Sequence, residues 1–133
     1  MYKENKMKIL TSYFSQLKKI DQTRFMPIGI AITPPRWYRG INYKKVAPTV
    51  DMLSLSENAY NYKFQKILDS LVPEEVVKEL TGLSGGKDIV LLCFEKDRNR
   101  CHRKLVADWL CNSLGLQIKE WGDDGENLSL FPG

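Results

Sequence analysis

Short hydrophobic runs of strand length recur along this chain. The clearest, DIVLLCF at residues 88–94, is apolar without a break, which is typical of a strand buried on both faces of a parallel sheet. Similar runs predict further strands at residues 8–13, 26–32 and 116–121.

The segments between these runs carry apolar residues at helical spacing. They predict a short amphipathic helix over 14–20, helices over 58–71 and 73–80, and a last helix from about Asn99 or Arg100 to Leu114. Leu105, Val106, Trp109 and Leu110 form a stripe on that last helix which can pack on a sheet. Alternating strands and helices indicate an α/β fold, a three-layer Rossmann-like domain with a mostly parallel sheet of about four strands.

The stretch between residues 36 and 56 has no clear periodicity and is predicted to be an irregular loop. It follows Thr33-Pro34-Pro35, a strong break in any strand. Its start, Arg36-Trp37-Tyr38-Arg39, interleaves cations with aromatics, a pattern that suits stacking on bases while holding phosphates. The alternative is a proline-led loop whose aromatic residues fold onto the core.

Composition fits one soluble domain. The chain has 133 residues, 43% hydrophobic and 27% charged. We expect a single domain over 1–133, with its core at about 8–121 and an acidic tail at about 122–133. The apolar runs are too short to cross a bilayer and the amino terminus does not resemble a signal peptide, so we expect no membrane partner and a cytoplasmic location.

The net charge of +4 is unevenly distributed. Residues 1–119 hold all 20 basic residues and 12 of the 16 acidic ones, a net charge of +8. A mildly basic body favours an anionic ligand, although it is equally compatible with plain solubility. The three cysteines are an odd number without paired spacing, so reduced thiols are expected in place of a disulfide framework.

Ligands of open parallel sheets bind beyond the carboxyl ends of the strands. The residues that follow the first three predicted strands are therefore candidates for one site. They are Ser12 and Tyr13, then Arg36 and Trp37, then the segment from Glu95 to Arg103.

Cys101, His102 and Arg103 fall in the first turn of the last predicted helix. The positive end of that helix and the neighbouring arginines favour the thiolate of Cys101 as a nucleophile. His102, the only histidine of the chain, is a candidate acid or base that Glu95 would orient. Arg103 and the helix amino terminus would bind a phosphate or carboxylate.

Simpler interpretations of the same residues stay open. His102 can be a hydrogen-bonded structural residue, and Cys101 a small, partly buried one. Cys93 and Cys111 lie in the predicted core.

Several chemistries are disfavoured by the absence of their motifs. There is no C-x-x-C pair, and adjacent Cys-His is a weak metal signal, so no metal site is predicted. No glycine-rich nucleotide fingerprint follows a strand. The sequence identifies no cofactor.

A set of motifs along the chain resembles the bacterial and phage family called domain of unknown function 488 (DUF488). The motifs are T-S-Y-F at 11–14, I-x-I-x-x-x-P-P ending at Pro35, tyrosine-leucine spacings within 55–68, and L-L-C-F-E-K…C-H-R-x-L-V-A-x-W-L over 91–110. The resemblance spans about residues 8–121. It implies Rossmann-like layering and marks Cys93, Glu95, Cys101, His102 and Arg103 as signature positions, without implying a reaction.

The leading hypothesis is a pocket for a small anionic or nucleotide-like ligand at the Cys-His-Arg helix start. A non-catalytic module that binds single-stranded nucleic acid through Trp37 and Tyr38 is the second hypothesis. The third is a protein-interaction role for the acidic tail. The sequence does not indicate whether the protein is an enzyme or an oligomer.

Overall fold

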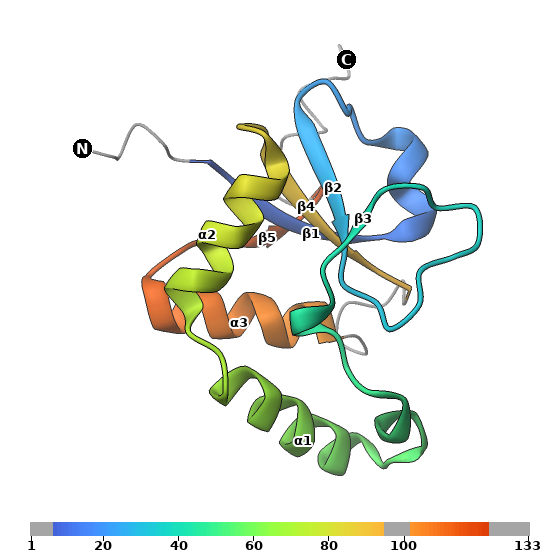
Figure 1. Ribbon diagram of the computed structural model, residues 1–133, viewed down its shortest axis with the longest axis vertical. Coiled ribbons are helices and arrows are strands. Elements are labelled where there is room, and N and C mark those ends of the chain that lie inside the picture. The colour runs from blue at the N-terminus through green and yellow to red at the C-terminus, as the bar shows by residue number, and fades with distance from the viewer. Residues whose placement is uncertain (1–6, 95–101, 123–133) are drawn as a thin grey trace.

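The protein is built on one five-stranded parallel sheet, seen in a computed structural model that describes residues 7–94 and 102–122 (Figure 1). The strand order is β3-β2-β4-β1-β5. The strands are β1 (Ile9–Tyr13), β2 (Phe25–Gly29), β3 (Ile41–Asn42), β4 (Asp88–Cys93) and β5 (Lys119–Glu120). The predicted α/β class with layered helices is confirmed.

The strand β3 corrects the sequence-based count of four. It lies within the stretch predicted to be irregular, and it has only two residues, Ile41 and Asn42, too few to show an alternating pattern. Its register on β2 pairs Ile28 with Ile41 and Gly29 with Asn42.

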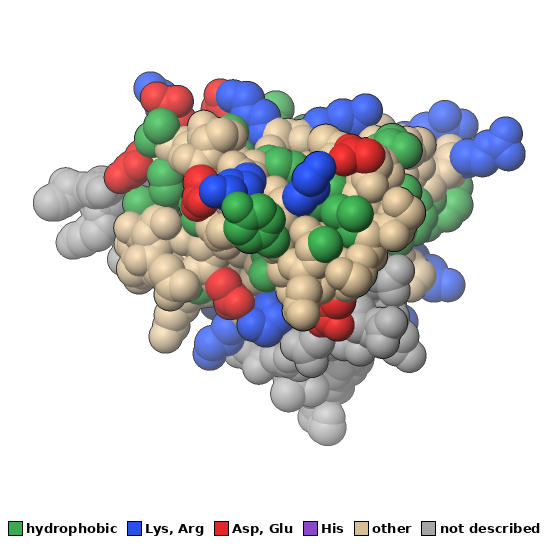
Figure 2. Space-filling model, turned by 90° about the horizontal axis from the view of Figure 1, so that it is seen from below, with side chains coloured by type: hydrophobic (Ala, Val, Ile, Leu, Met, Phe, Trp, Pro, Cys, Tyr) green, Lys and Arg blue, Asp and Glu red, His purple; other side chains and the backbone are tan. Residues whose placement is uncertain are grey.

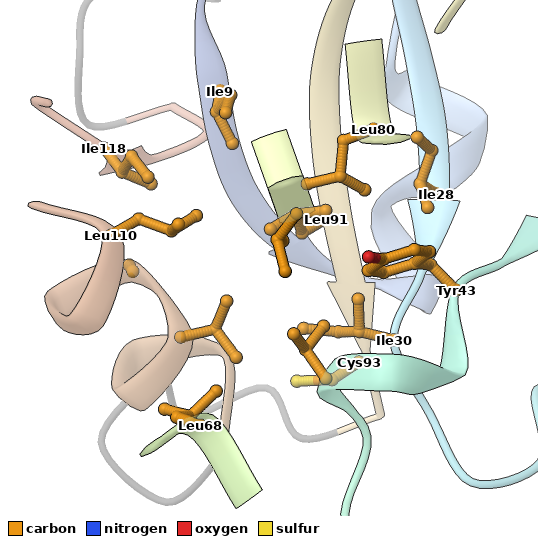
Figure 3. Packing of buried hydrophobic residues seen from close by; sticks show 14 of the residues in the cluster. Ile9, Ile28, Ile30, Tyr43, Leu68, Leu80, Leu91, Cys93, Leu110 and Ile118 are labelled. Atoms are coloured by element: carbon orange, nitrogen blue, oxygen red, sulfur yellow. The ribbon is translucent and has the colours of Figure 1, made fainter. Parts of the chain in front are cut away.

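Three α-helices cover one face of the sheet: α1 (Glu57–Asp69), α2 (Pro73–Ser84) and α3 (His102–Leu114) (Figure 1). Side chains of β1, β2 and β4 meet them in the main core, where Leu68, Leu80, Leu91 and Leu110 are fully buried (Figure 3). Pro73 opens α2 as predicted, because a missing N–H costs nothing in a first helical turn. Within the described residues no helix is long and apolar enough to cross a membrane.

The opposite face carries a smaller core and no α-helix among the described residues. The 3₁₀ helix η2 (Phe14–Lys19) forms where a short amphipathic helix was predicted, and buries Phe14. Phe14 and Ile20 pack there with Val90 and Leu92, the β4 residues that point away from the α-helices. Two further 3₁₀ turns, η3 (Lys44–Val46) and η4 (Val50–Ser54), lead into α1.

Asn42 fixes the backbone that leaves β2. Its side-chain amide donates to the Ala31 carbonyl at 2.8 Å, and the Ala31 N–H donates to its Oδ1 at 3.1 Å. One side chain therefore completes the ladder beyond the end of β2, where Ala31 is buried.

Replacing Asn42 with alanine should cost about 2 kcal/mol of unfolding free energy, because it leaves two buried backbone groups of Ala31 without partners. Urea unfolding measures this. Asn58→Ala, on the exposed side of α1, is the control. Equal stability of the two variants would contradict the assignment.

Candidate functional site

A pocket of about 1100 Å³ lies at the carboxyl edge of the sheet. Residues from β2's exit, from η4, from the first turns of α1 and α3, and from the end of β4 line it. They are Ala31, Ile32, Thr33, Pro48, Val50, Leu53, Leu55, Glu57, Tyr60, Asn61, Phe94, His102, Lys104 and Leu105.

The position of this pocket follows from the chain topology. β4 continues into α3 on one face, whereas β1 and β2 continue into segments on the opposite face. Adjacent parallel strands whose connections leave toward opposite faces open a crevice between their carboxyl ends. A pocket therefore lies at the edge where the site was expected, and the roles of the expected site residues stay predictions.

His102 is the first residue of α3 and forms part of the pocket wall. Its side chain is only 6% exposed. The ring stands edge-on to Phe64 of α1, with centroids 5.4 Å apart. Its Nε2 lies 2.5 Å from the carbonyl oxygen of Ile30, so we assign the proton to Nε2, from which it donates to that carbonyl. Figure 2, viewed from the α1 side, shows no histidine side chain among the described residues of that face, where basic, acidic and hydrophobic side chains are interspersed.

Burial lowers the pKa of His102 from 6.5 to about 4. The positive charge of neighbouring Arg103 lowers the pKa further, and the hydrogen bond to the Ile30 carbonyl opposes both effects. The imidazole is therefore neutral near pH 7. A neutral ring can accept or donate hydrogen bonds, but it does not attract an anion by charge.

Charged and polar groups complete the pocket wall. Lys104 is the cation among the described lining residues, and its ammonium lies 2.8 Å from Asp108 one turn along α3. Glu57 is the carboxylate of the same wall, in the first turn of α1. The Asn61 side chain makes no hydrogen bond to the described residues, and its amide offers a donor and an acceptor there.

Arg103 lies behind the pocket in a buried ion pair. Its side chain is fully buried, and it binds Glu120 in a fork, with Nε 3.0 Å from Oε1 and a terminal nitrogen 2.7 Å from Oε2. Thr11 donates its hydroxyl to Glu120 at 2.7 Å, and Arg103 also lies 3.1 Å from the sulfur of Cys93. The guanidinium covers the Tyr13 ring at 5.6 Å. Arg103 is not among the pocket-lining residues, and its anion-binding role stays a prediction.

The other predicted site residues are spread over both faces. Tyr13 lies on the α3 side of β1 and accepts a hydrogen bond from Gln16 at 2.5 Å. Ser12, the preceding residue, points to the opposite face and is buried, with no side-chain hydrogen bond to the described residues. Arg36 and Trp37 are exposed in the segment beyond β2. Glu95 and Cys101 lie outside the described residues.

Cys93 corrects the expectation of reduced thiols. It is disulfide-bonded, and its partner sulfur lies outside the described residues, while Cys111 is a free thiol. An odd number of cysteines excludes complete pairing but allows one bond with one thiol left over. The predicted burial of Cys93 is confirmed at 1% exposure. No group of three potential metal ligands occurs among residues 7–94 and 102–122.

Sequence reasoning missed several parts of the site. Glu120 was not among the expected site residues, although its position opposite Thr11 in the β1–β5 pair makes it the partner of Arg103. Tyr60, Asn61 and the η4 residues gave no signal, because they reach the pocket only through the packing of α1 on α3. Lys104, next to the Cys-His-Arg motif, could have been noticed from its place in the first helical turn.

Replacing Glu120 with glutamine should destabilise the fold by roughly 3–5 kcal/mol, because the buried Arg103 charge loses the carboxylate that binds it in a fork. Chemical denaturation measures the loss. The double change Arg103→Met with Glu120→Leu should recover most of it. Asp51→Asn, which breaks an exposed pair with Lys63, should have little effect. A Glu120→Gln loss no larger than that of Asp51→Asn would contradict the role of the pair.

The neutral state of His102 makes stability depend on pH. Because its pKa of about 4 in the folded chain lies below 6.5, the unfolded chain takes up the proton first as the pH falls. The stabilisation is complete above about pH 6.5 and is lost as the pH falls toward about 4. Between about pH 7 and 4.5 this amounts to roughly 2 kcal/mol.

The His102→Gln variant should lack this pH-dependent contribution to the free energy of unfolding and keep the rest of the pH dependence. Urea unfolding at both pH values measures the difference. Since the chain has one histidine, its imidazole NMR signals report the titration directly. A midpoint near 6.5 in the folded protein would overturn the assignment.

Comparison with known proteins gives a family. A family model described as "Active DUF488-N3 subclade" (DUF488-N3a) matches residues 12–114, from the carboxyl end of β1 to the end of α3. No curated protein and no solved structure matches the chain. The description names no reaction or substrate, and the matched range contains every pocket-lining residue. The chain therefore belongs to the DUF488 family.

Proposed function

We propose that the pocket at the carboxyl edge binds a small anionic, nucleotide-like ligand. The observation that carries this proposal is the composition of the pocket wall. It combines exposed hydrophobic side chains with the only histidine of the chain and one lysine.

The hydrophobic part favours a ligand with a flat apolar group. Val50 and Leu53 of η4 are 68% and 66% exposed, and Phe94 is 55% exposed, although all three are large and apolar. Leu55 joins them at the same wall. Exposed apolar side chains gathered around a concavity are typical of ligand sites, because a ligand removes them from water.

The polar part favours hydrogen-bonding and anionic groups on the same ligand. His102 and Asn61 supply neutral donors and acceptors, and Lys104 supplies the positive charge. The exposed pair of Lys104 with Asp108 contributes little to stability, so the ammonium can turn to an anion at small cost. In this proposal Arg103 supports the first turn of α3 from behind the pocket.

A reaction at this site would involve the adjacent Cys101, which precedes His102 in the sequence. Once the disulfide of Cys93 is reduced, so that all three cysteines are thiols, a Cys101 thiolate would act as nucleophile, and Glu95 would orient a neighbouring group. His102, with its pKa near 4, would serve as a hydrogen-bonding residue more effectively than as a base at neutral pH.

Calorimetric titration with nucleoside monophosphates, the matched nucleosides and inorganic phosphate tests the binding proposal. Monophosphates should bind most tightly. His102→Gln and Lys104→Gln should each weaken binding about 10-fold, the usual effect of losing one hydrogen bond to a charged group. Leu53→Ser should weaken the binding of nucleosides as well as of monophosphates, because it removes an apolar contact.

Leu83→Ser is the matched control, because Leu83 is an exposed leucine of α2 outside the pocket. Binding that is unchanged in all three pocket variants, or equally reduced in Leu83→Ser, would sink the proposal. Turnover of a bound ligand by wild type but not by Cys101→Ala, assayed with and without a thiol reductant, would extend it to catalysis.

A further inference from the structure

The segment that follows the pocket-lining residues 31–33, just after β2, is a firmly anchored turn. We call residues 34–40 the Trp37 loop. Tyr38 is its anchor: the ring is 8% exposed and packs edge-on against Phe14 at 5.0 Å. Its backbone N–H donates to the Pro35 carbonyl at 2.9 Å, and its hydroxyl donates to the Ile41 carbonyl at 2.6 Å.

Gly40 is part of this anchor. A Cβ at that position would come within 2.6 Å of the Tyr38 hydroxyl, so only glycine allows the chain to close over the ring. Tyr38 thus belongs to the core and is not available for stacking on a ligand. For this residue the structure matches the alternative interpretation of the sequence, in which the aromatic residues of the loop fold onto the core.

The neighbours of Tyr38 point outward. Trp37 is 55% exposed, and Arg36 and Arg39 are exposed on either side of it in the sequence. Within the described residues neither arginine makes an ion pair or a side-chain hydrogen bond. The other two arginines in that part of the chain, Arg24 and Arg103, are paired with Asp88 and Glu120.

An exposed indole between two guanidinium groups that pair with none of the described residues, on a fixed backbone, matches the chemistry of a single nucleic-acid strand. The indole face stacks on a base, and the guanidinium groups bind the flanking phosphates. An acidic peptide would satisfy the cations but would leave the indole without a flat partner. The net charge of +8 over residues 1–119 favours association with a polyanion.

We propose that the Trp37 loop binds single-stranded nucleic acid through Arg36, Trp37 and Arg39. The loop starts directly after Thr33, a pocket-lining residue, so the chain holds Trp37 within roughly 14 Å of the pocket wall. The bound strand therefore passes near the pocket mouth. The surface itself is independent of what the pocket binds.

Fluorescence anisotropy with labelled single-stranded DNA and RNA oligonucleotides, at several salt concentrations, tests this surface. The wild-type protein should bind at low salt, and the logarithm of its binding constant should fall linearly with the logarithm of the salt concentration. The double variant Arg36→Gln with Arg39→Gln should reduce that slope by about 1.4, the value for two phosphates of a single strand. Trp37→Ala should weaken binding about 10-fold, and Trp37→Phe should restore most of it by keeping an aromatic face.

Arg24→Gln is the matched control, because Arg24 is also an exposed arginine but is paired with Asp88. It should leave affinity and slope unchanged. His102→Gln should keep oligonucleotide binding even if mononucleotide binding in the pocket is lost, which separates this proposal from the pocket's function. The proposal is overturned if wild type does not bind at low salt, if the double variant keeps the wild-type slope, or if poly-glutamate competes as well as an oligonucleotide.

Discussion

Arg103 carries a positive charge into the interior of the protein, where its side chain has no contact with water. Glu120 neutralises that charge, and Thr11 holds the carboxylate in place. The pair joins the first turn of α3 to β5, the strand that lies beside β1. A buried charge tolerates little displacement, because removal of its partner leaves a large desolvation penalty. The pair therefore fixes where α3 begins, and with it the position of His102.

His102 depends on this arrangement in two ways. Its ring is held between the Ile30 carbonyl and the Phe64 ring, so its orientation is set by three elements. Burial and the adjacent Arg103 charge keep it neutral. The pocket wall is therefore a place for hydrogen bonding and apolar contact, and its described cation is Lys104. The chain segment just after β2 contributes to both proposed surfaces, since residues 31–33 line the pocket and residues 34–40 form the Trp37 loop. Asn42 holds the start of this segment through its two hydrogen bonds to Ala31.

The sequence predicted most of the sheet and helices. The apolar run of β4 and the stripe of α3 depend on local periodicity, and both elements appear where expected. The predicted ends were less accurate: β5 has two residues in place of the six expected from LQIKEW, because pairing with β1 involves only Leu10 and Thr11. Strand β3 was missed because two residues carry no period.

By itself the sequence determined that the chain forms a parallel α/β sheet and that His102 lies in the first turn of a helix at the carboxyl edge of that sheet. These conclusions need only the spacing of apolar residues and the rule that parallel strands end at one edge. Tertiary structure alone decided that Arg103 faces Glu120 instead of solvent, that His102 is neutral, and that α1 and η4 close the pocket. The physical reason is that each depends on contacts between distant parts of the chain, such as Thr11 with Glu120 and His102 with Ile30, and on the burial those contacts create. No local pattern encodes them.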